Sequence, residues 1–162
     1  MKTYVAMFQG QGGFWFSQGL YPLRDKLRKI GALADVFRYV DEPTAHVCIN
    51  NYRTTGYQIA LWGYSLGTST VLYEQNHHGC DLAMCCAVSK LETEWPIDKA
   101  KTKRAILWHG KGVLSAGGTN MGFDVIREIP GPWVPVVSHL MYQIAPMVVD
   151  DTVLEVQELL NI

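Results

Sequence analysis

One serine of this chain stands in a setting that could make its hydroxyl a nucleophile. The segment Gly63-Tyr64-Ser65-Leu66-Gly67 reads G-x-S-x-G and lies between an apolar run (58–62) and a helix-like stretch (68–75). A strand, a tight turn and a helix in that order hold a serine at the tip of the turn, where glycines relieve backbone crowding. With six serines and 15 glycines in the chain, chance supplies roughly 0.05 such patterns. The sequence therefore predicts a reactive serine at position 65.

A serine hydroxyl at its free pKa is a weak nucleophile and needs a base within hydrogen-bonding reach, usually a histidine. We favour His139, which follows the last expected strand in a proline-stiffened loop shortly before the closing helix. His109 is the rival, because it ends an expected strand at the same edge; it could also contact substrate. The other three histidines are expected away from the site, two of them as solvated surface residues: His46, His77 and His78.

Two backbone N–H groups must stabilise the negative charge that develops when a serine attacks a carbonyl. We expect one from Leu66, at the start of the helix, and the other from Gln11 or Gly12, in the glycine-rich loop after the first strand. Three aromatic residues are candidates for the wall of a substrate site, although they suit the hydrophobic core equally well: Phe14, Trp15 and Trp133.

These side chains need a scaffold, and the hydrophobic pattern predicts one. Short apolar runs indicate strands at 3–8, 35–40, 57–62, 81–88 and 104–108, and an alternating run indicates an edge strand at 123–129. Helical spacing indicates helices at 20–30, 43–52 and 68–75, and a closing helix with Asp151 as its N-cap. Strands that alternate with helices predict a parallel sheet covered on both faces. Sites in such sheets lie at the carboxyl ends of the strands.

Composition narrows the class of protein. At 162 residues with 48% hydrophobic content, the chain is expected to form one domain, 1–162. A formal net charge of −1 without a basic stripe argues against nucleic-acid binding. There is no apolar run long enough for a membrane span and no signal-peptide pattern. The four cysteines match no zinc pattern, and Cys85 and Cys86 are expected to be buried thiols in a reducing cytoplasm.

The glycine-rich loop after the first strand, the Gly63–Gly67 turn and the late His139 together resemble the α/β-hydrolase superfamily, in its compact, lidless serine-esterase form. The resemblance covers nearly all the chain. It implies a three-layer sandwich around a mostly parallel sheet of about six strands, without a lid domain and without the family's two N-terminal strands. No metal and no cofactor is implied.

The acid of the catalytic triad is where the sequence departs from this family. The usual position follows the strand that ends at Trp108, but the residues after it, 109–112, contain no carboxylate. A family variation places the acid one strand earlier, where Glu92 and Glu94 are available. We favour Glu92, with Asp124 as the runner-up. A dyad in which a backbone carbonyl or a water orients the histidine stays open.

The resemblance implies a serine hydrolase that cleaves small carboxylic esters, short-chain or aryl, through an acyl-enzyme on Ser65. Thioester or amide cleavage, or acyl transfer, would use the same groups. The missing acid motivates a different hypothesis, a non-catalytic binding module on a degenerate hydrolase scaffold. The missing strands would also leave a sheet edge exposed, which predicts a possible homodimer.

Overall fold

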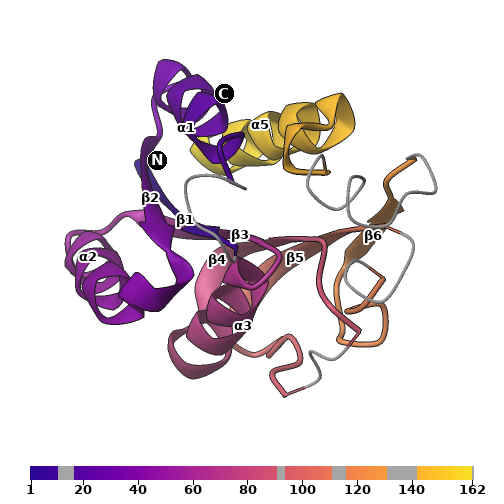
Figure 1. The fold of residues 1–162 in the computed structure, drawn as a ribbon. Helices are drawn as coiled ribbons and strands as arrows, with labels where there is room; N and C mark the ends of the chain where they lie inside the picture. The colour runs from indigo at the N-terminus through magenta and orange to yellow at the C-terminus, as the bar shows by residue number, and fades with distance from the viewer. Residues whose placement is uncertain (11–16, 91–93, 111–115, 131–141, 162) are drawn as a thin grey trace.

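The computed structural model describes residues 1–10, 17–90, 94–110, 116–130 and 142–161. Six parallel strands form one sheet in the order β2-β1-β3-β4-β5-β6, as Figure 1 shows. The strands are β1 (Thr3–Gln9), β2 (Leu33–Arg38), β3 (Gln58–Tyr64), β4 (Cys80–Cys86), β5 (Thr102–His109) and β6 (Val125–Glu128). The helices are α1 (Leu20–Lys29), α2 (Glu42–Thr54), α3 (Gly67–His78) and α5 (Pro146–Leu160), with short 3-10 turns η2 (Tyr39–Asp41) and η3 (Tyr142–Ile144). The expected three-layer α/β architecture is confirmed.

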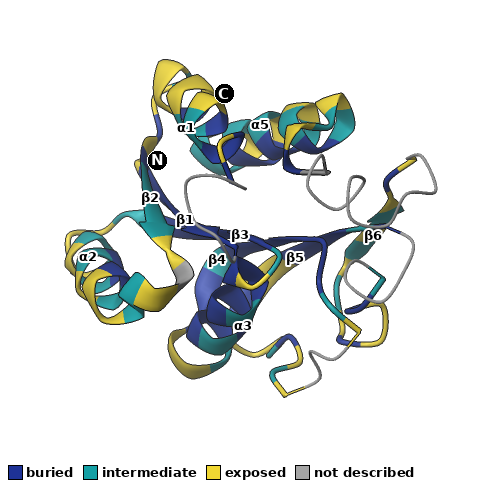
Figure 2. Cartoon of the chain, in the orientation of Figure 1, coloured by how far each residue is buried: buried dark blue, intermediate teal, exposed yellow. Residues whose placement is uncertain are grey.

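The sheet is buried on both faces, and each face has its own hydrophobic core. Along β1, Val5 and Met7 pack with residues of α1 and α5, whereas Tyr4, Ala6 and Phe8 pack with residues of α2 and α3. Successive side chains of a strand point to opposite faces, so an unbroken apolar run is what a strand in the middle layer requires. Figure 2 shows the central strands buried and the outward sides of the helices exposed.

The closing helix α5 begins at Pro146, so our assignment of Asp151 as its N-cap is wrong. Proline is well suited to the first turn of a helix, because its missing N–H has no partner to lose there. Asp151 lies one turn further along and faces the sheet. It accepts a hydrogen bond of 3.0 Å from the Trp108 indole and pairs with Arg127 at 2.5 Å. Asp151 therefore fixes α5 against β5 and β6.

The hydrophobic pattern predicted the position of the edge strand β6 better than that of the edge strand β2. The edge strand β6 is confirmed, at Val125–Glu128, but β2 spans Leu33–Arg38 rather than the expected 35–40. A bend follows Arg38, where the 3-10 turn η2 begins. Pairing of two chains through an edge strand stays a prediction. None of the helices among the described residues is long and apolar enough to cross a bilayer.

Candidate active site

The strand order reverses between β1 and β3, and the carboxyl ends of these two strands form the topological switch point of the sheet. Within the sheet, β2 lies beside one edge of β1, and β3 lies beside the other edge of β1. Ligands of open α/β sheets bind where the strand order reverses in this way. Gly10 follows β1 and Ser65 follows β3, so both lie at this switch point. Flavodoxin-like sheets have the same strand order, so the order alone does not distinguish a hydrolase from a nucleotide-binding protein. The backbone conformation at Ser65 is more specific.

Ser65 has a backbone conformation that serine seldom adopts. Its φ is +54°, in the left-handed region, which costs about 1–2 kcal/mol for a residue with a side chain. Two backbone hydrogen bonds, one through the Ser65 N–H and one through its carbonyl, maintain this strained conformation. The Ser65 N–H donates to the Cys86 carbonyl at 3.0 Å, and its own carbonyl accepts from the Thr68 N–H at 2.9 Å. Strain maintained in this way concentrates at functional sites, and a serine on a strained strand-to-helix turn is the geometry of a nucleophile elbow.

The two glycines of the motif are required by close contacts. A Cβ atom at position 63 would come within 2.5 Å of the Gly67 carbonyl oxygen. A Cβ atom at position 67 would collide with the Phe8 carbonyl oxygen of β1. The elbow therefore folds tightly on itself and against β1. Ser65 remains half-exposed at its tip.

The residue after Ser65 offers a backbone donor. Leu66 precedes the first residue of α3, and within the described part of the chain its N–H has no hydrogen-bond acceptor. A helix N-terminus carries a partial positive charge as well as free N–H groups. The role of the Leu66 N–H as an oxyanion donor stays a prediction.

Gly10 lies directly against Ser65, a contact that the sequence analysis did not single out. A Cβ atom there would lie 2.8 Å from the Ser65 Cβ, so only glycine allows β1 to end this close to the serine. The Gly10 N–H donates to the buried Ser17 hydroxyl at 3.2 Å, which positions the start of the glycine-rich loop. The available signal was a glycine directly after the first buried strand.

His109 lies at the same edge of the sheet as Ser65, at the end of β5. β4 separates β5 from β3, which places the two backbone positions about 10 Å apart across the sheet. The Nδ1 atom of His109 is buried and has no hydrogen-bond partner among the described residues. The possible roles of His109, as a substrate contact or as the base, both stay predictions.

The structure does not bring Asp124 to Ser65. The Asp124 carboxylate accepts from the Ala105 N–H at 2.7 Å and pairs with Lys99. Ala105 is four residues before the end of β5, about 13 Å from the carboxyl edge. Burial alone would raise the pKa of Asp124, but the Lys99 ammonium and the Ala105 N–H hold it below its usual value. Asp124 therefore joins β6 to β5.

The remaining candidates lie outside the described residues: Gln11, Gly12, Phe14, Trp15, Glu92, Trp133 and His139. Their roles stay predictions.

A thiol next to the elbow offers no alternative nucleophile. Cys85 and Cys86 are free and buried, as expected. Burial raises the pKa of the Cys86 thiol far above its ordinary value, so the thiolate does not form near neutral pH. Cys86 contributes to the elbow through its carbonyl group, which accepts the Ser65 N–H.

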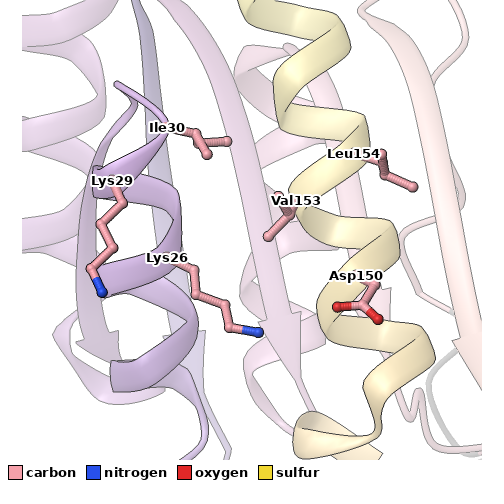
Figure 3. A pocket seen from close by; sticks show the side chains of 6 residues that line it. All are labelled: Lys26, Lys29, Ile30, Asp150, Val153 and Leu154. Atoms are coloured by element: carbon pink, nitrogen blue, oxygen red, sulfur yellow. The ribbon is translucent and has the colours of Figure 1, made fainter.

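A groove of about 440 Å³ lies between α1 and α5, and Ser65 is not among the residues that line it. Figure 3 shows its lining, which comes from the last turn and end of α1 and the middle of α5: Lys26, Lys29, Ile30, Asp150, Val153 and Leu154. Every lining residue belongs to the helical layer, so this groove is no part of the candidate active site.

Comparison with known proteins supports the fold. No model of a known protein family matches the chain, and a comparison with curated proteins finds no match. Among solved structures, the chain is similar to the crystal structure of the ydeN gene product from B. subtilis, with a TM-score of 0.62 and 15% sequence identity. The likeness covers 93% of this chain and 97% of the other. At this identity it shows the fold alone, a three-layer α/β architecture around a six-stranded parallel sheet.

Proposed function

We propose that the protein is a serine hydrolase that cleaves small carboxylic esters. The observation that carries the proposal is the backbone of Ser65, with φ at +54° on a strand-to-helix turn. This strained residue lies at the topological switch point of the sheet, immediately before α3. A strained serine at the switch point of the sheet, with a helix N-terminus directly after it, is what acyl transfer through a serine nucleophile needs.

In the proposed mechanism, the Ser65 hydroxyl attacks the ester carbonyl while His139 takes its proton. The oxyanion accepts hydrogen bonds from the Leu66 N–H and from an N–H of Gln11 or Gly12. The tetrahedral intermediate collapses and expels the alcohol, which receives the proton from His139. Water, deprotonated by His139, then hydrolyses the acyl-enzyme by the same steps.

The described elements on either side of His139 support its role as the base. β6 is parallel to the other strands and ends at Glu128, at the same edge of the sheet as Ser65. α5 begins at Pro146, and its last turn reaches the other edge, where the Leu160 carbonyl accepts from the N-terminal ammonium at 3.2 Å. The end of β6 and the start of α5 therefore both lie toward the edge of the sheet where Ser65 is found.

For the acid, we expect Glu92→Gln and Asp124→Asn to have different effects. If Glu92 orients His139, the Glu92→Gln variant loses at least tenfold in kcat, about 1.4 kcal/mol of transition-state stabilisation. Asp124→Asn should leave kcat within about twofold and lower the free energy of unfolding by about 1 kcal/mol, because its exposed ion pair is screened by solvent. Steady-state kinetics and urea denaturation of both variants measure this. A loss in kcat smaller than threefold for Glu92→Gln would favour the dyad.

The substrate class follows from the expected openness of the site. Short-chain or aryl esters suit a site without a lid and with aromatic walls, for which Phe14, Trp15 and Trp133 are the candidates. His109, at the end of β5, is a further substrate contact. Thioester cleavage and acyl transfer use the same nucleophile and the same oxyanion donors.

A binding module on a hydrolase scaffold is the alternative, and covalent labelling separates the two. A fluorophosphonate reacts with a serine only when a base activates it, so we expect one adduct per chain, on Ser65, detected by mass spectrometry. Ser65→Ala should carry no adduct. A folded wild type that stays unlabelled after prolonged incubation would support the binding module.

A further inference from the structure

Three metal-ligating side chains from two helices meet on one face of the sheet. His46 comes from α2, and Glu74 and His78 come from α3, one turn apart on the same side of the helix. One ligand atom from each of the three lies within 4.8 Å of the other two. Figure 1 shows α2 and α3 as neighbours beneath the sheet. We propose that His46, Glu74 and His78 bind a divalent transition-metal ion of the Zn²⁺ type.

The donor set determines the class of ion. Two imidazole nitrogens and one carboxylate oxygen are ligands of Zn²⁺ sites that have three protein ligands and leave one position for water. Imidazole ligands also suit Co²⁺, Ni²⁺ and Cu²⁺, whereas Mg²⁺ and Ca²⁺ prefer oxygen ligands alone. His78 is exposed and His46 is half-buried, so the cluster is open to solvent on one side.

The buried negative charge of the Glu74 carboxylate would favour the binding of a cation at this cluster. Its side chain is only 2% exposed, and its hydrogen-bond partner is the His46 Nδ1, at 3.2 and 3.3 Å. A buried carboxylate is costly unless a cation or several donors compensate its charge. The neighbouring Arg53 guanidinium is directed elsewhere, to the Asn50 side chain at 2.5 Å and the Gly79 carbonyl at 2.8 Å. A metal ion would neutralise Glu74.

Asn50 supports the ring of His46 from the opposite side. The Asn50 side chain lies 2.7 Å from the His46 Nε2, one turn further along α2. Hydrogen bonds of this kind fix the orientation of a ligating imidazole and choose which nitrogen faces the metal. With Nε2 held by Asn50, the Nδ1 atom faces Glu74. When Nδ1 binds the ion, the imidazole proton moves to Nε2, and the Asn50 side chain must exchange its hydrogen bond with Arg53 for one in which its carbonyl oxygen accepts this proton.

A bound ion would join α2 to α3, and α3 is the helix that begins behind Ser65. Glu74 lies nine residues after Ser65, about 13 Å along the helix. The ion would therefore hold the helix that follows Ser65 without contacting Ser65 itself. The signal in the sequence was a Glu-x-x-x-His pair on one helix, but only the packing of α2 against α3 adds His46.

The test is isothermal titration of ZnCl₂ into the metal-free protein, for the wild type, His78→Gln and His77→Gln. His77 is the matched control, because it is the exposed neighbour of His78 on α3 but is bonded through Nδ1 to the Tyr73 carbonyl at 2.9 Å and stacked on the Tyr73 ring. We expect one ion per wild-type chain with a Kd of about 10 μM or tighter. His78→Gln should weaken binding at least tenfold, and His77→Gln less than threefold.

Two melting-temperature measurements separate a loss of zinc binding from a loss of folding, and neither depends on catalysis. Metal-free His78→Gln should melt within about 2 °C of the wild type, because the residue is exposed, and Zn²⁺ should raise the Tm of the wild type but not that of this variant. Three results would overturn the site: no zinc binding by the wild type, full binding by His78→Gln, or equal losses in His78→Gln and His77→Gln. Ester hydrolysis is not used, so the proposal stands or fails separately from the proposed function.

Discussion

Replacing Ser65 by alanine is expected to lower kcat for p-nitrophenyl acetate by at least about 1,000-fold, or about 4 kcal/mol. The nucleophile and its base act as one unit, so removal of the serine eliminates the covalent route and leaves only binding and oxyanion stabilisation. The strained φ of +54° and the Leu66 N–H would remain in the variant and could not substitute for the missing oxygen. Initial rates of both proteins, prepared identically, measure the effect.

Ser65→Gly is the control that separates lost chemistry from lost folding. It should be as inactive as Ser65→Ala, yet its free energy of unfolding should be about 1 kcal/mol higher than that of Ser65→Ala, because glycine adopts a positive φ without strain. Urea denaturation of the two variants tests this difference. Turnover in Ser65→Ala close to that of the wild type would remove Ser65 from the mechanism.

Gly67→Ala should destabilise the protein by about 3 kcal/mol or more, or prevent folding. The new methyl group would overlap the Phe8 carbonyl oxygen and lie 2.9 Å from the Gln9 carbonyl oxygen. Both atoms belong to β1, an inner strand of the sheet that cannot move aside without breaking its pairing with β3. The midpoint and slope of urea denaturation at pH 7 give the change in the free energy of unfolding.

Gly31→Ala is the matched comparison for Gly67→Ala. Gly31 has φ at +97° after α1, and a Cβ atom there meets no atom within 4 Å. Its replacement should therefore cost about 1 kcal/mol of backbone strain and nothing for collision. Equal destabilisation by the two substitutions would show that Gly67 does not lie in close contact with the Phe8 carbonyl oxygen of β1.

Strands and helices could be predicted from the sequence where a single local pattern, such as an unbroken apolar run, specifies them. The buried runs that became β1, β3, β4 and β5 are apolar on both faces, and the alternation of strands with helices leaves a parallel sheet as the natural outcome. The start of α5 at Pro146 was missed because a proline-initiated first turn shows no polar cap in the sequence. Asp151 resembled a cap, but its carboxylate is bound by Trp108 and Arg127 from other elements.

By itself, the sequence determined the layer architecture and the elbow of residues 63–67, because hydrophobic period and glycine spacing act between near neighbours in the chain. Only the tertiary structure decided what meets the elbow and what does not. The strand order places Gly10 against Ser65, sets His109 two strands away and leaves Asp124 near the middle of β5. The packing of α2 on α3 likewise joins His46 to Glu74 and His78. Such contacts depend on crossovers and helix packing between distant segments, which no local pattern encodes.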